Sequence, residues 1–85
     1  MGNTVQRVIE MMSSRLKLNT DIGQINENTP LFGENGLGLD SIDVLELVVG
    51  IKKEFGVEIL DRETAEKIFT TVGAIAEFVE KNKLH

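Results

Sequence analysis

The sequence contains no cysteine, and its single histidine, His85, is the last of 85 residues. Without cysteine the chain can form no disulfide, no thiolate metal site and no cysteine nucleophile. A terminal histidine is usually poorly ordered and is a weak candidate for the base that a serine nucleophile requires. No Gly-x-Ser-x-Gly elbow and no EF-hand pattern is present. We therefore expect no catalytic residue and no metal site, and we predict that the chain is not an enzyme.

Long apolar runs and an excess of basic charge are also missing. No stretch approaches the roughly 18 apolar residues of a membrane span, and no signal peptide opens the chain. The net charge is −5, and nine of the acidic residues lie between positions 21 and 61. This negative field repels nucleic acid and favours a basic patch on a partner protein. We expect a soluble, cytoplasmic monomer with no nucleic-acid partner and no membrane span.

The length predicts a single domain, residues 1–85, and the apolar spacing predicts four helices. The first begins after a cap at Asn3 or Thr4 and ends near Lys17. The second spans Ser41 to Phe55 and ends at Gly56, where a left-handed residue is favoured. A short third helix, 62–69, is capped by Asp61, and a fourth begins at a Thr70 or Thr71 cap. The predicted fold class is all-α, a small four-helix bundle with a short third helix.

The stretch between the first two helices, residues 18–39, has no sustained period and contains the only proline. We interpret it as a long loop, and a loop of this length usually has a function. The apolar residues expected to anchor it to the core are Ile22, Ile25, Leu31, Phe32 and Leu37. Residues 57–60 are interpreted as a second loop with apolar anchors, because a lone strand is not stable.

The second predicted helix carries two separate groups of apolar residues. One group is expected to pack inward and comprises Val44, Leu47, Val48, Ile51 and Phe55. The other, Ile42, Leu45 and Val49, is expected to face outward for a partner, because exposed apolar patches mark interfaces. Full burial of the helix is the alternative. Lysine is almost never fully buried, so Lys52 within the apolar arc argues against it. Gly50 is expected to leave a bare spot on the exposed side.

Ser41 opens this helix and allows several interpretations. It suits a helix cap, and a hydrolytic nucleophile is disfavoured because no base is available. A helix start also favours an anion, so a serine there can carry a phosphate. Capping and carrying are compatible, and the local sequence leaves both open.

The ordered set of motifs resembles the acyl carrier protein family. Residues 40–47, Asp-Ser-Ile-Asp-x-x-Glu-Leu, are similar to the family's attachment motif. The Glu-Phe-Gly-Val-Glu-Ile segment at 54–59 and the segments Ala-Glu-Lys-Ile and Thr-Thr-Val at 65–68 and 70–72 resemble the rest of the family pattern. Length, acidity and the long first loop agree, so the resemblance covers essentially the whole chain.

The resemblance implies a carrier that works through a covalent 4′-phosphopantetheine arm from coenzyme A. A phosphopantetheinyl transferase would attach the arm to Ser41, beside Asp40, and the arm's thiol would hold an acyl group as a thioester. The inward group would line an acyl cleft. Asp43 and Glu46, with Ile42, Leu45 and Val49, would meet acyl-processing enzymes of fatty-acid, polyketide or related pathways through their basic patches.

Two alternatives remain at this point: an aminoacyl or peptidyl carrier protein, and a carrier-like interaction module that is never modified. Lys52 and Lys53 also stand where family members are often acidic. We therefore predict a carrier for a dedicated pathway rather than the housekeeping fatty-acid carrier.

Overall fold

The computed structural model describes residues 2–16, 18, 22–33 and 36–82. In this part of the chain four α-helices are present: α1 (Gly2–Arg15), α2 (Ser41–Phe55), α3 (Arg62–Ile68) and α4 (Val72–Asn82). A 3₁₀ turn, η1 (Ile22–Gln24), interrupts the first loop. Helix α1 packs against both α2 and α4, and α3 contacts α4. The all-α, four-helix prediction is confirmed for the described residues.

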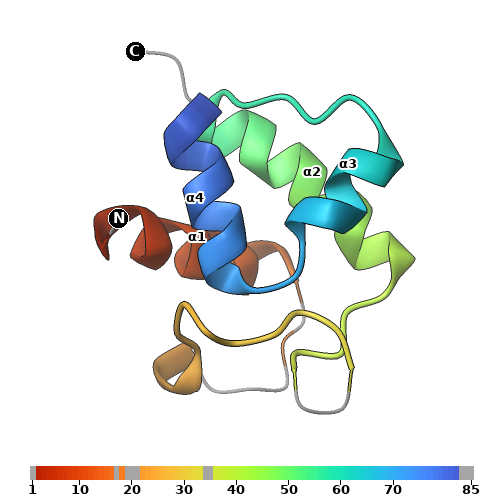
Figure 1. Cartoon of the computed structure of the whole chain (residues 1–85). Helices are drawn as coiled ribbons and strands as arrows, with labels where there is room; N and C mark the ends of the chain where they lie inside the picture. The colour runs from red at the N-terminus through yellow and green to blue at the C-terminus, as the bar shows by residue number, and fades with distance from the viewer. Residues whose placement is uncertain (1, 17, 19–21, 34–35, 83–85) are drawn as a thin grey trace.

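The helices pack around one another (Figure 1), and the core consists of their inner faces and a few loop residues. Its largest fully buried side chains are those of Val8, Met12, Leu31, Leu47, Ile51, Phe69, Val72, Ile75 and Val79. At roughly 0.8 kcal/mol for each buried methylene, these side chains supply the main favourable term for folding. Leu47 and Ile51 therefore hold the inner side of α2 in place, which leaves its outer side for other contacts.

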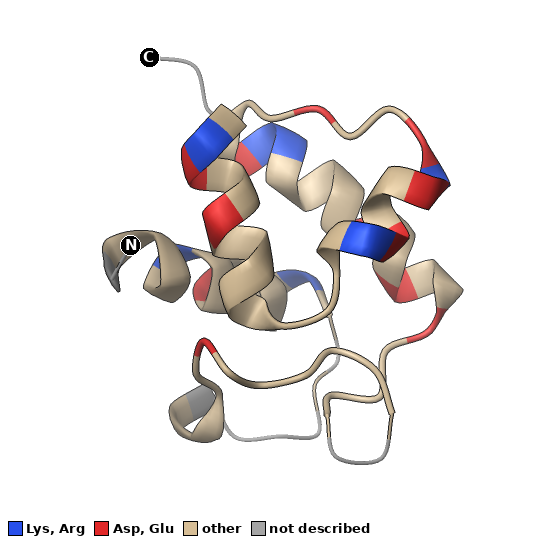
Figure 2. Ribbon diagram, in the orientation of Figure 1, with Lys and Arg blue, Asp and Glu red and all other residues tan. Residues whose placement is uncertain are grey.

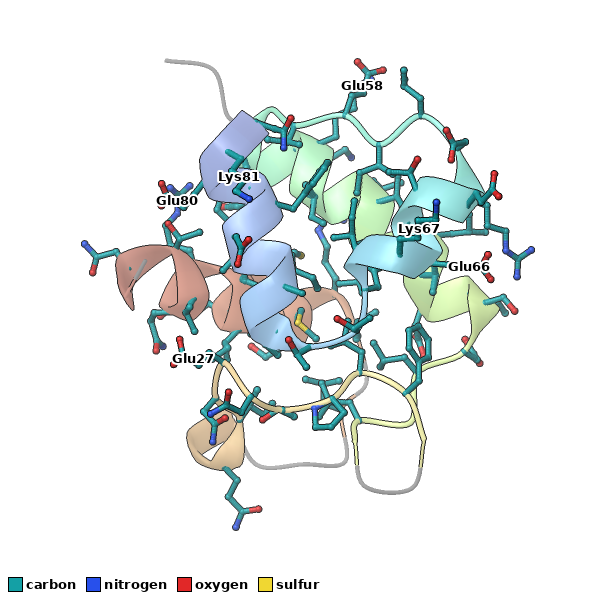
Figure 3. All side chains as sticks on the ribbon, viewed as in Figure 1. Glu27, Glu58, Glu66, Lys67, Glu80 and Lys81 are labelled. Carbon is teal, nitrogen blue, oxygen red and sulfur yellow. The ribbon has the colours of Figure 1, made fainter. Side chains whose placement is uncertain are left out.

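Helix α1 begins earlier than predicted. It starts at Gly2, so Asn3 and Thr4 lie inside its first turn instead of capping it. Thr4 is buried, and its hydroxyl donates a hydrogen bond to the Glu80 carboxylate of α4, which lies over α1 in Figure 3. The Thr4 hydroxyl therefore makes a tertiary contact and does not act as the expected local cap. The helix ends at Arg15, and Lys17, the predicted end, lies outside the described residues.

Gly50 is buried, so the prediction of a bare spot on the exposed side is wrong. A β-carbon at this position would lie 2.6 Å from Met11 Sδ and 2.7 Å from Arg15 Cδ. The glycine therefore marks the crossing of α1 over α2, where long α1 side chains lie against the α2 backbone. The sequence shows that position 50 has no side chain, but it does not show that Met11 and Arg15 of α1 fill the space.

The first loop is tied to the α3–α4 connection by backbone hydrogen bonds. Leu31 N–H donates to the Thr70 carbonyl at 3.0 Å, and Leu39 N–H donates to the Leu31 carbonyl at 3.1 Å. Ile25 and Leu31 are buried and Leu37 packs against the core, as predicted, whereas Phe32 is exposed. The side chain of the fifth predicted anchor, Ile22, lies outside the described part. These bonds fix the backbone that leads directly into α2.

The ends of the later helices follow the predicted local signals. Asp61 caps α3, accepting the Thr64 N–H at 2.7 Å, and Thr71 caps α4, accepting the Ala74 N–H at 3.1 Å. Gly56 ends α2 with φ of 71°, the left-handed conformation that glycine adopts without strain. Helix α3 ends one residue before the predicted Phe69, which is its C-cap. Short-range capping rules were sufficient for these boundaries.

Candidate functional site

Ser41 is the first residue of α2 and is exposed. Asp40, not Ser41, is the N-cap, so the interpretation of Ser41 as the cap is wrong. The Asp40 carboxylate accepts the Asp43 N–H at 3.0 Å, and the Asp43 carboxylate accepts the Asp40 N–H at 3.0 Å. This reciprocal capping box fixes the first turn and makes no use of the serine. The Ser41 hydroxyl forms no hydrogen bond with the described residues and is available for attachment.

Two hollows meet at Ser41. The first has a volume of about 220 Å³ and is lined mainly by apolar groups, among them Val44, Val48 and Ala65. The second has a volume of about 390 Å³ and is bordered by Phe32 and by charged residues. Ser41, Val44 and Arg62 line both hollows. A group bonded to Ser41 would therefore begin between an apolar space and a more polar one.

The cleft expected from the inward group of α2 is only partly as predicted. Val44 and Val48 line the apolar hollow, but Leu47 and Ile51 are fully buried in the core beneath. Leu45, from the outward group, lines the hollow as well. A helical angle alone could not separate the floor of the cleft from the core, because the elements packed around α2 decide which of its residues remain uncovered.

The outward group of α2 is solvent-accessible. Ile42 is 70% exposed, Leu45 65% and Val49 40%. Asp43 and Glu46, on the same helix, are half-buried, and Lys52 is exposed. The alternative of a fully buried helix is therefore wrong. The role of these residues in partner binding stays a prediction.

Acidic residues dominate the surroundings of Ser41. Figure 2 shows acidic residues in the first half of α2, both acidic and basic residues in α3, and basic residues near the end of α2. The Thr64 backbone N–H, and then the Thr64 side chain, hold the pKa of Asp61 below its ordinary value of 3.8, with a smaller contribution from Lys67. Asp61 thus stays ionised at neutral pH at the edge of the apolar hollow. A partner that docks here meets a negative surface.

Sequence reasoning missed several residues that border the site. Leu60, Arg62 and Ala65 line the apolar hollow, and Phe32 and Leu39 line the other. Val57 and Ile59 are buried, as expected of loop anchors, but Leu60 is 84% exposed. Leu60 follows Ile59 directly, and neighbouring residues in extended chain point to opposite sides. Because Val57 and Ile59 share one side of this segment, Leu60 falls on the other side with Glu58. This position was a signal that could have identified Leu60 as a surface residue.

Other kinds of site find no support in the described residues. No group of three or more His, Cys, Asp or Glu side chains there is arranged to hold a metal ion. None of the helices in the described part is long and apolar enough to cross a membrane.

Comparison with known proteins agrees with this geometry. Residues 6–79 match the family model described as "Phosphopantetheine attachment site". The chain is 43% identical over 68 residues to the acyl carrier protein of Helicobacter pylori strain G27, covering 80% of this chain and 82% of that protein. It is 41% identical over 68 residues to the acyl carrier protein of Helicobacter acinonychis strain Sheeba, with the same coverage. The chain therefore belongs to the acyl carrier protein family, whose members carry 4′-phosphopantetheine as a covalent cofactor.

Proposed function

We propose that this protein carries acyl groups as thioesters on a 4′-phosphopantetheine arm attached to Ser41. The observation that supports the site is the free, exposed hydroxyl of Ser41 at the meeting point of two hollows. The arm fits these residues, because a group bonded there has both an apolar space and a more polar one beside it. When bound, the arm supplies the thiol that this cysteine-free chain lacks.

Loading is a phosphoryl transfer to the serine. A bond forms between Ser41 Oγ and the phosphorus that bears the pantetheine in coenzyme A. The pyrophosphate bond of coenzyme A breaks, and 3′,5′-adenosine bisphosphate leaves. The hydroxyl proton passes to a base on the transferase. The contribution of this chain is the position of the hydroxyl, which the capping box of Asp40 and Asp43 fixes at the start of α2.

The partner face in this proposal is the outer side of α2. Ile42, Leu45 and Val49 supply apolar contact, and Asp43 and Glu46 supply negative charge for basic patches on the transferase and on acyl-processing enzymes. The acyl cargo then enters the apolar hollow beside Ser41 or passes to the enzyme. The chain's own role is to carry and present the group, as in its family, and catalysis belongs to the partners.

A dedicated pathway is the finer part of the proposal. Lys52 and Lys53 are exposed at the end of α2, and Lys52 lies 3.6 Å from Glu58. They give the partner face a basic end beside its acidic first half. A partner of this carrier would therefore need a different charge pattern from a partner of a carrier that is acidic at these positions. Efficient replacement of the housekeeping carrier in a fatty-acid synthesis assay would contradict this part. The cytoplasmic location and monomeric state belong to the same proposal and can be tested by cell fractionation and size-exclusion chromatography.

The deciding experiment is an intact mass. The protein and a Ser41→Ala variant are incubated with coenzyme A, magnesium and a broad-specificity phosphopantetheinyl transferase. A gain of one phosphopantetheine by the parent alone supports carriage and the site together. A gain by both proteins would contradict the site. No gain by either would favour the unmodified interaction module.

A further inference from the structure

We propose that Arg62 binds the phosphodiester of the group attached to Ser41. This inference rests on the proposed function, because it requires a phosphate at that hydroxyl. Its starting point is position: Arg62 and Ser41 belong to different helices, yet both line the apolar hollow and the more polar one beside it. A phosphodiester on Ser41 Oγ lies where these hollows meet, so Arg62 borders the space that the phosphate enters.

The charges at this point favour a cation. Three carboxylates, those of Asp40, Asp61 and Glu66, line the two hollows together with Arg62. Among the described residues that line either hollow, Arg62 is the one cation. A phosphodiester brings a further negative charge into this acidic ring. Like charges repel, so the attached arm would be pushed away from the protein without a compensating positive group.

Arginine suits this role by its chemistry. Its planar guanidinium donates two parallel hydrogen bonds to a phosphate, and it remains charged at all physiological pH values. Arg62 is exposed and forms no salt bridge with the residues that the structure describes, including Glu66 one turn along α3. The guanidinium therefore breaks no intramolecular ion pair when it turns to the phosphate.

Lys67 provides a matched control on the same helix. It carries the same charge as Arg62 and is also exposed, but it lines neither of the two hollows that meet at Ser41. Figure 3 shows Lys67 and Glu66 projecting from α3 in different directions. Loss of Lys67 changes the net charge as much as loss of Arg62, so the pair separates a local contact from a general electrostatic effect.

The test uses the loaded protein and reads the phosphate directly. Parent, Arg62→Gln, Arg62→Lys and Lys67→Gln proteins are loaded with coenzyme A and the transferase, and loading is confirmed by intact mass. The ³¹P signal of each loaded protein is recorded at low and high salt, and the Arg62 Nε–H signal of the parent is recorded before and after loading. We expect the ³¹P signal to shift in Arg62→Gln, to move back in Arg62→Lys, and to stay at the parent position in Lys67→Gln.

The expected Nε–H result is a shift of the Arg62 signal on loading, reduced at high salt, where exposed charges are screened. Equal ³¹P signals in the parent and Arg62→Gln, with no change of the Arg62 signal on loading, would overturn the inference. Equal shifts in Arg62→Gln and Lys67→Gln would overturn it too, since that result indicates net charge alone. Failure of the proposed function is a separate outcome, because the parent would then gain no mass.

Discussion

The capping box that presents Ser41 can be tested by removing its acceptor. In Asp40→Ala the Asp43 N–H loses the carboxylate that lies 3.0 Å away, and the reciprocal geometry of the first turn is lost. Replacing such an N-cap by alanine costs about 1 kcal/mol in the free energy of unfolding. For a domain of this size that corresponds to a fall in Tm of about 4–8 °C. The transition is followed by circular dichroism during thermal and urea unfolding.

Asp40→Asn is the matched control for this change. Asparagine keeps a side-chain oxygen that accepts the Asp43 N–H and removes only the charge, so its stability should lie close to that of the parent. Loading of both variants, followed by intact mass at low protein concentration, then separates two roles of Asp40. If alanine slows loading and asparagine does not, the cap positions Ser41. If both slow it equally, the charge contacts the transferase.

One pattern of results would refute the reasoning. An Asp40→Ala protein as stable as the parent would show that the two hydrogen bonds do not hold the first turn of α2. A variant whose free energy of unfolding falls with urea at a different slope would instead indicate a change in the unfolded or native ensemble. The slopes of variant and parent are therefore compared first, and the free energies afterwards.

Three further predictions concern the scaffold and the partner face. Gly36→Ala should destabilise the fold by about 1–3 kcal/mol in urea unfolding, because a β-carbon there lies 2.4 Å from the Pro30 backbone oxygen. Gly50→Ala should change the free energy of unfolding by less than about 1 kcal/mol, since the flexible side-chain ends near it can move away and alanine favours the helix. Equal losses in the two variants would contradict this distinction. The pKa of Asp61 is lower in the folded protein than its ordinary value of 3.8, so its contribution to stability is present above 3.8 and is lost as the pH falls through the folded pKa. Asp61→Asn should therefore reduce the loss of Tm between neutral pH and pH values below 3.8. The same dependence of Tm on pH in the variant and the parent would count against the cap. Ile42→Asp and Val49→Asp should leave the free energy of unfolding within about 0.5 kcal/mol of the parent value. Both should lower the rate at which the transferase attaches phosphopantetheine in a steady-state loading assay. Unfolding of both variants would disprove an exposed partner face.

The helix boundaries were predictable where a local signal sets them. Asp61, Thr71 and Gly56 act within one turn of their own position, so the caps and the end of α2 could be read from short stretches. The start of α1 was not predictable in this way. Its buried Thr4 bonds to Glu80, 76 positions along the chain, and no short-range rule contains that contact.

The candidate site divides along the same line. The sequence predicted Ser41 as the attachment site from the motif at residues 40–47, and it predicted the exposed apolar group of α2 from helical spacing, because both depend on the type and spacing of residues within one helix. It did not identify Arg62, which reaches the site from α3, or Phe32, which reaches it from the first loop. It also misplaced Gly50, whose burial depends on the crossing of α1.

By itself, the sequence determined the helical class, the motif that marks Ser41 as the proposed attachment site and the acidic character of its surroundings, since composition and local spacing contain these properties. Only the tertiary structure decided which α2 residues lie beneath the cleft and which line it. It alone brought Arg62 and three carboxylates around Ser41. The physical reason is that burial and charge at a point depend on every element packed there, and those elements are distant in sequence.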